Sequence, residues 1–324
     1  MFCPSCGDDA SPRNAKFCES CGASLTADAP PRIKTRGCQC VKPEFDQDGF
    51  CQTCGLKPAK PLPPVEYEQT IDAALALASD KGHRHPTNQD FGIVARRADG
   101  AALIVVADGV STSDNAEAAS RAAAKAVEKI FLKGRAPGDA LATEAERCVR
   151  AAAEAVIATP IAERYYDGAA STIVVAIISN NAATGALEVG LAWVGDSRAY
   201  VVAANVPEVL LTRDDSWSTE QIEAGAMTRD EAMHSPNAHA ITRWLGMPLD
   251  ELEVHARHSL LTRGSALLLC SDGLWNYVDA PGALARAFTE AAKDADAAAI
   301  CRALVGLANE AGGVDNITVG LFRA

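Results

Sequence analysis

Four aspartates, spread over a chain of 324 residues, lie at the ends of apolar runs of strand length, with Gly or Asn close by. They are Asp90, Asp108, Asp272 and Asp315. A carboxylate where a buried strand meets a loop is costly to desolvate unless a partner balances its charge. One such residue could form an Asx-turn or cap a helix, but four of them indicate a shared oxygen-ligand site for hard divalent cations. This pattern predicts a metal-dependent hydrolase.

Cysteine usage points to a second kind of metal site, because eight of the 11 cysteines lie within the first 54 residues. Such clustering in a reducing compartment indicates metal binding rather than disulfides. The first set forms two Cys-x-x-Cys-Gly knuckles, and the second a Cys-x-Cys followed by a Cys-x-x-Cys; the eight residues are Cys3, Cys6, Cys18, Cys21, Cys38, Cys40, Cys51 and Cys54. Two knuckles complete a tetrahedral site, so each set is predicted to hold one structural Zn²⁺ that supplies folding energy. The alternative for the second set is a redox pair, which no surrounding βαβ pattern supports.

These segments resemble the zinc ribbons that many prokaryotic proteins carry at the N-terminus, and they suggest four parts. We expect a zinc ribbon at residues 1–26, a second zinc-ribbon-like module at 36–57, a proline-rich linker at 58–66 and one large domain at 67–324. Residues 1–57 contain seven Lys or Arg and seven Asp or Glu. This balance gives no basic footprint for nucleic acid, so we expect a docking or oligomerisation module, with a simple tether as the alternative.

In the large domain, apolar strand-length runs alternate with Ala-rich helical segments. Strands are expected at 71–78, 91–95, 101–107, 172–178, 187–194, 198–203, 266–270 and 316–322, with a hairpin turn at Gly195-Asp196. Helices are expected at about 114–133, 139–158 and, as a pair, 281–311, with short helices after capping boxes at Ser218 and Thr228. Helices do not follow every strand, which argues against a doubly wound parallel sheet. The prediction is an α+β fold, a four-layer α-β-β-α sandwich of two mostly antiparallel sheets flanked by helices and preceded by the small zinc-ribbon modules.

Charge and hydropathy exclude several classes of partner. The net charge of −12 disfavours nonspecific binding to nucleic acid or to an anionic membrane. A solvated acidic surface is the commoner origin of such a charge, although a carboxylate metal site fits it too. No apolar run approaches the ~20 residues needed to span a bilayer, and the first residues lack the pattern of a signal peptide. We therefore expect a cytoplasmic protein with neither nucleic acid nor membrane as a partner.

Over about residues 70–324, the motifs resemble, in order, those of the metal-dependent Ser/Thr protein phosphatases of type 2C, the PPM family. They are Asp80-x-Gly82, Asn88-Gln89-Asp90, Val106-Ala107-Asp108-Gly109, Gly168-x-x-Ser171-Thr172, Val194-Gly195-Asp196-Ser197-Arg198, Leu211-Thr212-x-Asp214, Ile241-Thr242-Arg243-x-Leu245-Gly246, Cys270-Ser271-Asp272-Gly273 and Gly313-x-Asp315-Asn316. Each motif is weak alone, whereas the ordered set is specific.

The resemblance implies two Mn²⁺ or Mg²⁺ ions, and a third, weaker ion at Asp196. Asp108 would bridge the two main ions, and Asp272 and Asp315 would complete the shell of one of them. Asp90 and the backbone carbonyl of Gly109 would complete the other. A water activated by both ions would attack the phosphorus of a phosphomonoester on Ser or Thr, with no covalent phosphoenzyme.

Four positions depart from the family pattern. His85 stands where the family often has an arginine that binds the substrate phosphate, and Arg84 lies beside it. Adjacent strand residues face opposite sides, so Arg84 does not simply replace that arginine; His85 or a shifted Arg84 is expected to contact phosphate. Because histidine titrates near pH 6–7, substrate affinity is expected to fall as the pH rises through that range. Gln89 replaces a common Glu, Val110 replaces a His found in some eukaryotic members, and Asp215 replaces the His of a Thr-x-Asp-His-Ser motif.

Other polar residues have simpler interpretations. His234, His239, His255 and His258 lie outside the motifs and are expected to be surface or capping residues. Arg198 could equally pair with groups near the Asp196 turn or bind substrate.

The predicted function is that of a Ser/Thr phosphoprotein phosphatase whose substrates are made by a Ser/Thr kinase, with the zinc ribbons directing it to a protein partner. Two alternatives remain open at this point. One is a degenerate phosphatase fold that senses or binds phosphoproteins without cleaving them. The other is a scaffold in which the zinc ribbons carry the function and the large domain regulates it.

Overall fold

The computed structural model describes residues 44, 46–47, 50–53, 65–136, 138–160, 168–181, 183–293 and 295–324. The chain divides into two compact units, Met1–Pro61 and Leu62–Ala324. Every helix and strand assigned within the described ranges belongs to the second unit. Of the eight cysteines predicted to bind zinc, only Cys51 is described, and its side chain is buried. The other seven lie outside the described residues, so the zinc ribbons stay a prediction.

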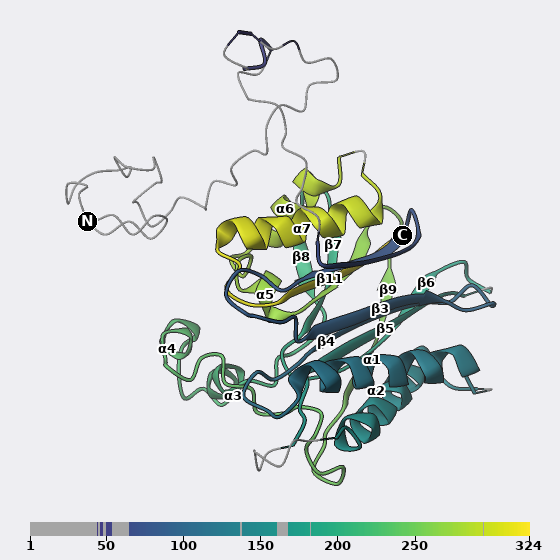
Figure 1. The fold of residues 1–324 in the computed structure, drawn as a ribbon. Coiled ribbons are helices and arrows are strands. Elements are labelled where there is room, and N and C mark those ends of the chain that lie inside the picture. The colour runs from purple at the N-terminus through teal and green to yellow at the C-terminus, as the bar shows by residue number, and fades with distance from the viewer. Residues whose placement is uncertain are drawn as a thin grey trace. The chain divides into compact units, whose positions relative to one another are not determined.

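The second unit contains two fully antiparallel sheets that face each other (Figure 1). The six-stranded sheet has the order β1 (Tyr67–Asp72), β2 (Leu75–Asp80), β11 (Ile317–Arg323), β10 (Ala266–Cys270), β7 (Arg198–Ala203) and β8 (Val206–Leu210). The five-stranded sheet has the order β3 (Asp90–Arg96), β4 (Ala102–Asp108), β5 (Ile173–Asn180), β6 (Leu187–Val194) and β9 (His255–Leu261). The predicted pair of antiparallel sheets is confirmed.

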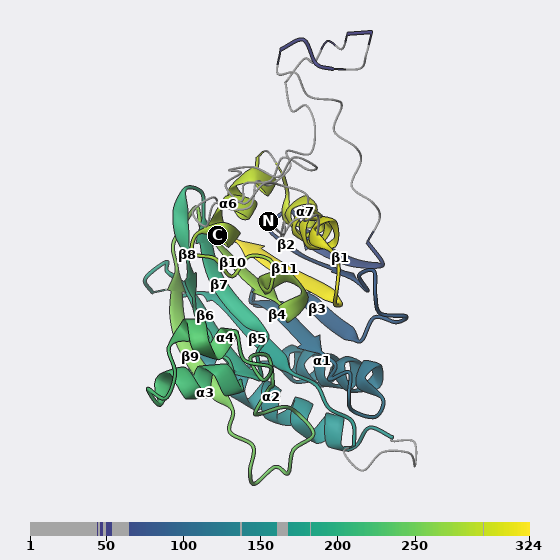
Figure 2. The same cartoon turned by 90° about the vertical axis from the view of Figure 1, so that its left-hand side faces the viewer.

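Helices cover the outer face of each sheet (Figure 1). The five-stranded sheet is covered by α1 (Ala116–Lys133) and α2 (Leu141–Ile157), and the six-stranded sheet by α6 (Ala283–Ala291) and α7 (Ala297–Ala311). Three short helices complete the unit: α3 (Trp217–Glu223), α4 (Arg229–Met233) and α5 (Asp272–Trp275). Figure 2 shows α3 and α4 on the side of the sandwich where β6 and β9 lie. None of the helices in the described ranges has the length and apolar character needed to cross a membrane.

Three apolar layers hold the four layers of secondary structure together. One lies between the sheets and includes Ile104 and Leu267. The second packs Phe131 and Val149 of the helices against the five-stranded sheet, and the third packs α6 and α7 against the six-stranded sheet. A strand between a helix layer and another sheet is buried on both faces. This explains why β4 is continuously apolar rather than alternating.

Two predictions about strands were wrong. Residues 71–78 are not one strand, because β1 ends at Asp72, whose carboxylate accepts a hydrogen bond from Ala74 N at 2.8 Å and forms an Asx-type turn into β2. Residues 187–194 and 198–203 are not a hairpin, because β6 belongs to the five-stranded sheet and β7 to the six-stranded sheet. The turn at Gly195-Asp196 therefore carries the chain from one sheet to the other.

The capping boxes gave one correct and one shifted prediction. Thr228 and Glu231 form the expected reciprocal box at the start of α4. Helix α3 begins two residues earlier than predicted, because Ser216, not Ser218, accepts a hydrogen bond from Thr219 N and acts as the N-cap.

Candidate active site

The four predicted aspartates come together at one end of the sandwich. Asp90 begins β3 and Asp108 ends β4, and the antiparallel register places the two residues directly opposite each other. Asp272 follows β10 at the start of α5, and Asp315 lies just before β11, the neighbour of β10 in the other sheet. The negative charges of Asp90, Asp272 and Asp315 all lie close enough to raise the pKa of the Asp108 carboxyl. The site therefore combines the strand ends of both sheets.

One carboxylate oxygen of Asp90 accepts a hydrogen bond, and the other is free to bind a ligand. Its Oδ2 accepts a hydrogen bond from Ser271 Oγ at 2.7 Å, and Ser271 Oγ in turn accepts one from Thr318 N at 3.0 Å. Its Oδ1 is buried and has no hydrogen-bond partner among the described residues. An unpartnered buried carboxylate oxygen is costly, and a hard cation is the kind of ligand that would satisfy it.

Asn316 fixes the loop between β2 and β3 against Asp315. Its Oδ1 accepts a hydrogen bond from Gln89 N at 2.8 Å, and its Nδ2 donates to Lys81 O at 2.8 Å and Thr87 O at 3.1 Å. The loop approaches so closely that a Cβ on Gly82 would lie 2.3 Å from Asp315 O. The motif Gly313-x-Asp315-Asn316 contains this residue, but its sequence alone does not indicate that Asn316 holds the loop.

Two glycines allow the carboxylates to approach. A Cβ on Gly273, next to Asp272, would lie 1.9 Å from Asn316 O, so any side chain there would push the start of α5 away from Asp315. Gly109 donates its N–H to Gln89 O at 3.1 Å, and a Cβ on Gly109 would lie 2.5 Å from Ala116 O. Each glycine is thus required by close backbone packing.

The crowding of like charges perturbs the acidities of these groups. Burial, followed by the charges of the neighbouring aspartates, raises the pKa of Asp108 and that of Asp272 well above the usual range. Burial is also the largest cause for Asp90, whose pKa rises to about 6. Asp108 and Asp272 nevertheless keep part of their surface exposed to solvent, so an ion can reach them. Such a cluster favours protons or a divalent cation over free carboxylates.

The chemistry of the donors fits Mn²⁺ or Mg²⁺. All predicted ligands are oxygens, which these hard ions prefer. No group of three or more His, Cys, Asp or Glu within the described part of the chain is preformed as a ligand set for a single ion. Mg²⁺ usually keeps several waters in its coordination shell, so it does not need a complete set of protein ligands.

His85 reaches the carboxylate cluster, whereas Arg84 does not. Both lie in the loop between β2 and β3 rather than in a strand, so the argument from strand alternation does not apply to them. His85 Nε2 lies 3.3 Å from Asp315 Oδ1, while the side chain of Arg84 is exposed. Gln89 uses its Oε1 to accept a hydrogen bond from Ser111 Oγ at 2.7 Å.

Asp196 lies buried at the turn between β6 and β7. Burial, and after it the charge of Asp214, raises the pKa of Asp196 to about 7. Its carbonyl oxygen accepts a hydrogen bond from Trp275 Nε1 at 3.0 Å. This backbone contact joins the turn to α5, which begins with Asp272.

The contacts of Arg198 are structural. It binds Asp214 through Nε and Nη2, at 3.0 and 2.6 Å, and its Nη1 donates to Asp279 at 3.0 Å. Its guanidinium carbon lies 3.7 Å from the centroid of the Trp275 ring. The sequence left two roles open for Arg198, pairing with groups near the Asp196 turn or binding substrate. These contacts agree with the first role.

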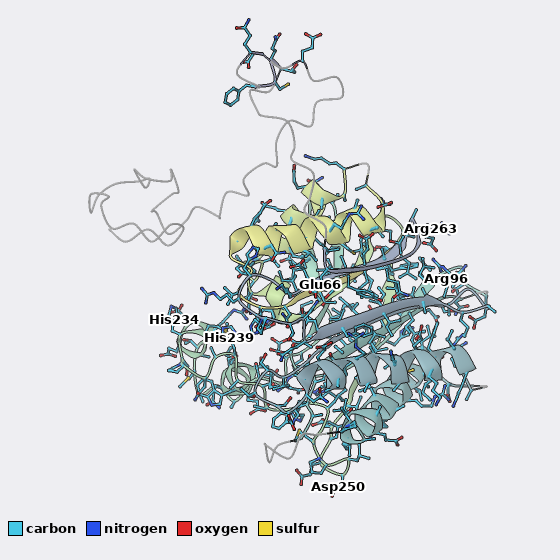
Figure 3. All side chains as sticks on the ribbon, in the orientation of Figure 1. Glu66, Arg96, His234, His239, Asp250 and Arg263 are labelled. Atoms are coloured by element: carbon cyan, nitrogen blue, oxygen red, sulfur yellow. The ribbon has the colours of Figure 1, made fainter. Side chains whose placement is uncertain are left out.

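The four histidines of the second half of the chain divide into two groups. His234 and His239 are exposed and lie on the α3–α4 side of the unit, as Figure 3 shows. His258 is also exposed, at the edge strand β9. His255 on the same strand is different: its Nε2 lies 2.8 Å from the buried carboxylate of Asp215. The prediction of a surface or capping role for His255 was wrong, because β9 itself was not predicted.

Comparison with known proteins identifies the family. Residues 81–307 match the family model "Protein phosphatase 2C", and since this is more than half of the chain, the chain belongs to that family. It is 28% identical over 247 residues to the "Serine/threonine phosphatase stp" of Listeria innocua, covering 76% of this chain and 93% of that protein.

Two solved structures of similar proteins agree. The serine/threonine phosphatase of S. agalactiae has a TM-score of 0.66 and 27% identity, covering 80% of this chain and 100% of that one. The catalytic domain of the phosphatase PstP, solved in complex with two manganese ions, has a TM-score of 0.60 and 28% identity, covering 76% and 96%.

Proposed function

We propose that the protein is a Ser/Thr phosphoprotein phosphatase that hydrolyses phosphomonoesters with water activated by two Mn²⁺ or Mg²⁺ ions. The observation that carries the proposal is the pairing of Asp90 with Asp108 across β3 and β4, next to Asp272 and Asp315. It is supported by membership of the protein phosphatase 2C family, by relatives named as serine/threonine phosphatases, and by one of them holding two manganese ions.

In this proposal each of the two ions has its own carboxylate ligands, and one carboxylate is shared. Asp108 would be shared by both ions, Asp272 and Asp315 would help to hold one of them, and Asp90 with the Gly109 carbonyl would help to hold the other. When bound, such ions would supply a water of lowered pKa and positive charge for the phosphate oxygens. The protein contributes rigidity, because Ser271 fixes Asp90 by a hydrogen bond.

Hydrolysis of p-nitrophenyl phosphate and of a phosphothreonine peptide by the full chain tests this function. We expect turnover with Mn²⁺ or Mg²⁺ and none with EDTA. A folded protein that turns over neither substrate with any divalent ion would instead support a degenerate phosphatase fold that binds phosphoproteins.

Replacing His85 by alanine should raise KM for the phosphopeptide about ten-fold while lowering kcat less. The reason is the loss of one charge-assisted hydrogen bond to phosphate, worth about 1.5–3 kcal/mol, from a ring whose Nε2 lies 3.3 Å from Asp315. Steady-state kinetics of His85→Ala and of the neighbouring Arg84→Ala measure the effect, and the Arg84 variant should raise KM less. An unchanged KM in His85→Ala, or a larger increase in Arg84→Ala, would assign the phosphate contact to another residue.

We further infer that the N-terminal cysteines hold two structural zinc ions and that this region binds a protein partner. We also propose that the enzyme is cytoplasmic and that it opposes a Ser/Thr kinase. The support is the spacing of the Cys-x-x-Cys-Gly knuckles. Metal analysis of the full chain should give about two zinc ions per chain, and a Cys18→Ser/Cys21→Ser variant should lose one of them. A full chain without zinc would end this idea.

A further inference from the structure

We propose that Asp215 and His255 form a positioning pair that holds the Gly195 turn and thereby orients Asp196 toward the third, weaker ion that the family resemblance implies. The inference rests on the proposed function and deepens it. It concerns two residues that take no part in the main carboxylate cluster. It also accounts for Asp215, one of the four positions where the sequence departs from the family pattern.

Asp215 holds Gly195 by two hydrogen bonds. The side chain of Asp215 is fully buried, and its Oδ2 accepts a hydrogen bond from Gly195 N at 3.0 Å. Its own backbone N–H donates to Gly195 O, also at 3.0 Å. A residue bound at both its N–H and its carbonyl has little freedom to rotate. The orientation of the next residue, Asp196, is therefore set in large part by Asp215.

The turn itself demands such support. Gly195 has φ +99°, and a Cβ there would lie 2.6 Å from Thr172 Cβ. Glycine permits this conformation but also has many others available. On the far side of Asp196, Ser197 Oγ lies 2.9 Å from Thr172 Oγ1. Asp196 is thus flanked by two fixed residues, as a ligand at a preorganised metal site must be.

His255 fixes the other oxygen of Asp215. Its Nε2 lies 2.8 Å from Asp215 Oδ1, and Arg243 Nη1 donates to the same oxygen at 3.1 Å. The imidazole stacks on Trp193, with 5.2 Å between ring centroids and 24° between planes. Trp193 is itself tied down, because its Nε1 donates to Arg213 O at 2.7 Å. The buried carboxylate therefore has partners on both oxygens, and its position is determined from three directions.

The arrangement explains the departure at position 215. The motif that the chain resembles has His there, and this chain has Asp215 instead. The imidazole is supplied from β9 by His255, on a strand that lies next to β6. The Asp215 carboxylate accepts from Gly195 N through one oxygen, and His255 and Arg243 hold the other oxygen. His255 thus helps to fix the carboxylate that binds the turn.

Three variants test the pair in the full chain. His255→Phe keeps an aromatic ring against Trp193 but removes the donor to Asp215, and Asp215→Asn keeps the size of the side chain but removes its charge. His258→Phe is the matched control, because His258 lies on the same strand, is 48% exposed and has only a 4.0 Å contact with Glu188. Isothermal titration with Mn²⁺ measures each class of bound ion, and thermal unfolding shows that each variant is folded.

We expect the dissociation constant of the weakest Mn²⁺ ion to rise roughly ten-fold or more in His255→Phe and Asp215→Asn, the scale known for loss of a residue behind a metal ligand. The tighter ions should keep their wild-type affinity, and His258→Phe should match the wild type throughout. The Mn²⁺ concentration that gives half-maximal hydrolysis of p-nitrophenyl phosphate should shift in the same two variants.

Folded variants that bind the weakest ion as the wild type does would overturn the inference, and so would an equal loss of all classes of ion. A wild type that hydrolyses the substrate with Mn²⁺ but binds no third ion would overturn the inference alone. A wild type that neither binds Mn²⁺ nor hydrolyses the substrate would overturn the proposed function and this inference together.

Discussion

Replacing Asp108 by asparagine should lower the Mn²⁺-dependent turnover of p-nitrophenyl phosphate by a factor on the order of 10²–10³ at least, the range found when one group that stabilises transition-state charge is removed. Asp108 lies opposite Asp90 and senses the charges of Asp272 and Asp315. A neutral amide has one uncharged oxygen, so it cannot bind two cations as the two oxygens of a carboxylate can. The loss should appear in kcat/KM at saturating Mn²⁺, and added Mn²⁺ should not restore it.

The same variant should remain folded, which separates loss of chemistry from loss of structure. The raised pKa of Asp108, caused first by burial and then by its acidic neighbours, means that its charge is unfavourable in the metal-free protein. Asp108→Asn should therefore unfold in EDTA at the wild-type temperature or above it. Asp250→Asn is a suitable control, because Asp250 is exposed and lies at the periphery of the unit (Figure 3). Turnover above a tenth of the wild-type rate in Asp108→Asn would contradict the assignment.

Much of the candidate site follows from local sequence. Asp90, Asp108 and Asp272 could each be placed at a strand end, because the adjoining apolar runs mark buried strands. That these ends meet depends on long-range pairing, in which β11 lies between β2 and β10. No local pattern encodes this order. The aspartate pattern and the motif resemblance predicted that these residues share one site, but the strand order that brings them together was not predicted.

The errors have identifiable physical causes. Strand β9 was missed because it lies at a sheet edge and exposes several of its residues, so its sequence lacks the apolar alternation of a half-buried strand. His255 was misread as a consequence. The turn at Gly195 was read as a hairpin because a short glycine turn between two apolar runs suits either a hairpin or a crossing between two sheets. Only packing of the two sheets decides between these, and packing is not visible in a local window.

Without metal ions, the protein should become less stable as the pH rises from about 5 to 8. The pKa of Asp90 is about 6 and that of Asp196 about 7 in the folded protein, with burial as the largest cause in both. In the unfolded chain an aspartate titrates near 3.9. Between these values the folded state binds more protons than the unfolded state, so the free energy of unfolding falls as the pH rises.

Urea or thermal unfolding in EDTA at several pH values measures this slope. The pKa of Asp279 is lowered below the usual aspartate range, because Arg198 and Arg229 outweigh the effect of its burial. Asp279 therefore titrates at lower pH and does not hide the slope. Asp90→Asn should flatten the slope, since it removes one of the four aspartates whose pKa is raised in the folded protein. Exposed Asp250→Asn should leave the slope unchanged.

Saturating Mn²⁺ should reverse the trend, and this reversal is the strongest sign that the carboxylates form a metal site. An ion that binds only the folded state stabilises it by mass action, and it binds the deprotonated carboxylates, so its effect grows with pH. The same charges that destabilise the metal-free protein at pH 8 thus become the source of its stability when the ions are bound. A slope that is equal in EDTA and in Mn²⁺ would mean that Asp90 and Asp196 are ordinary buried acids, and that the ions, if they bind, do so elsewhere.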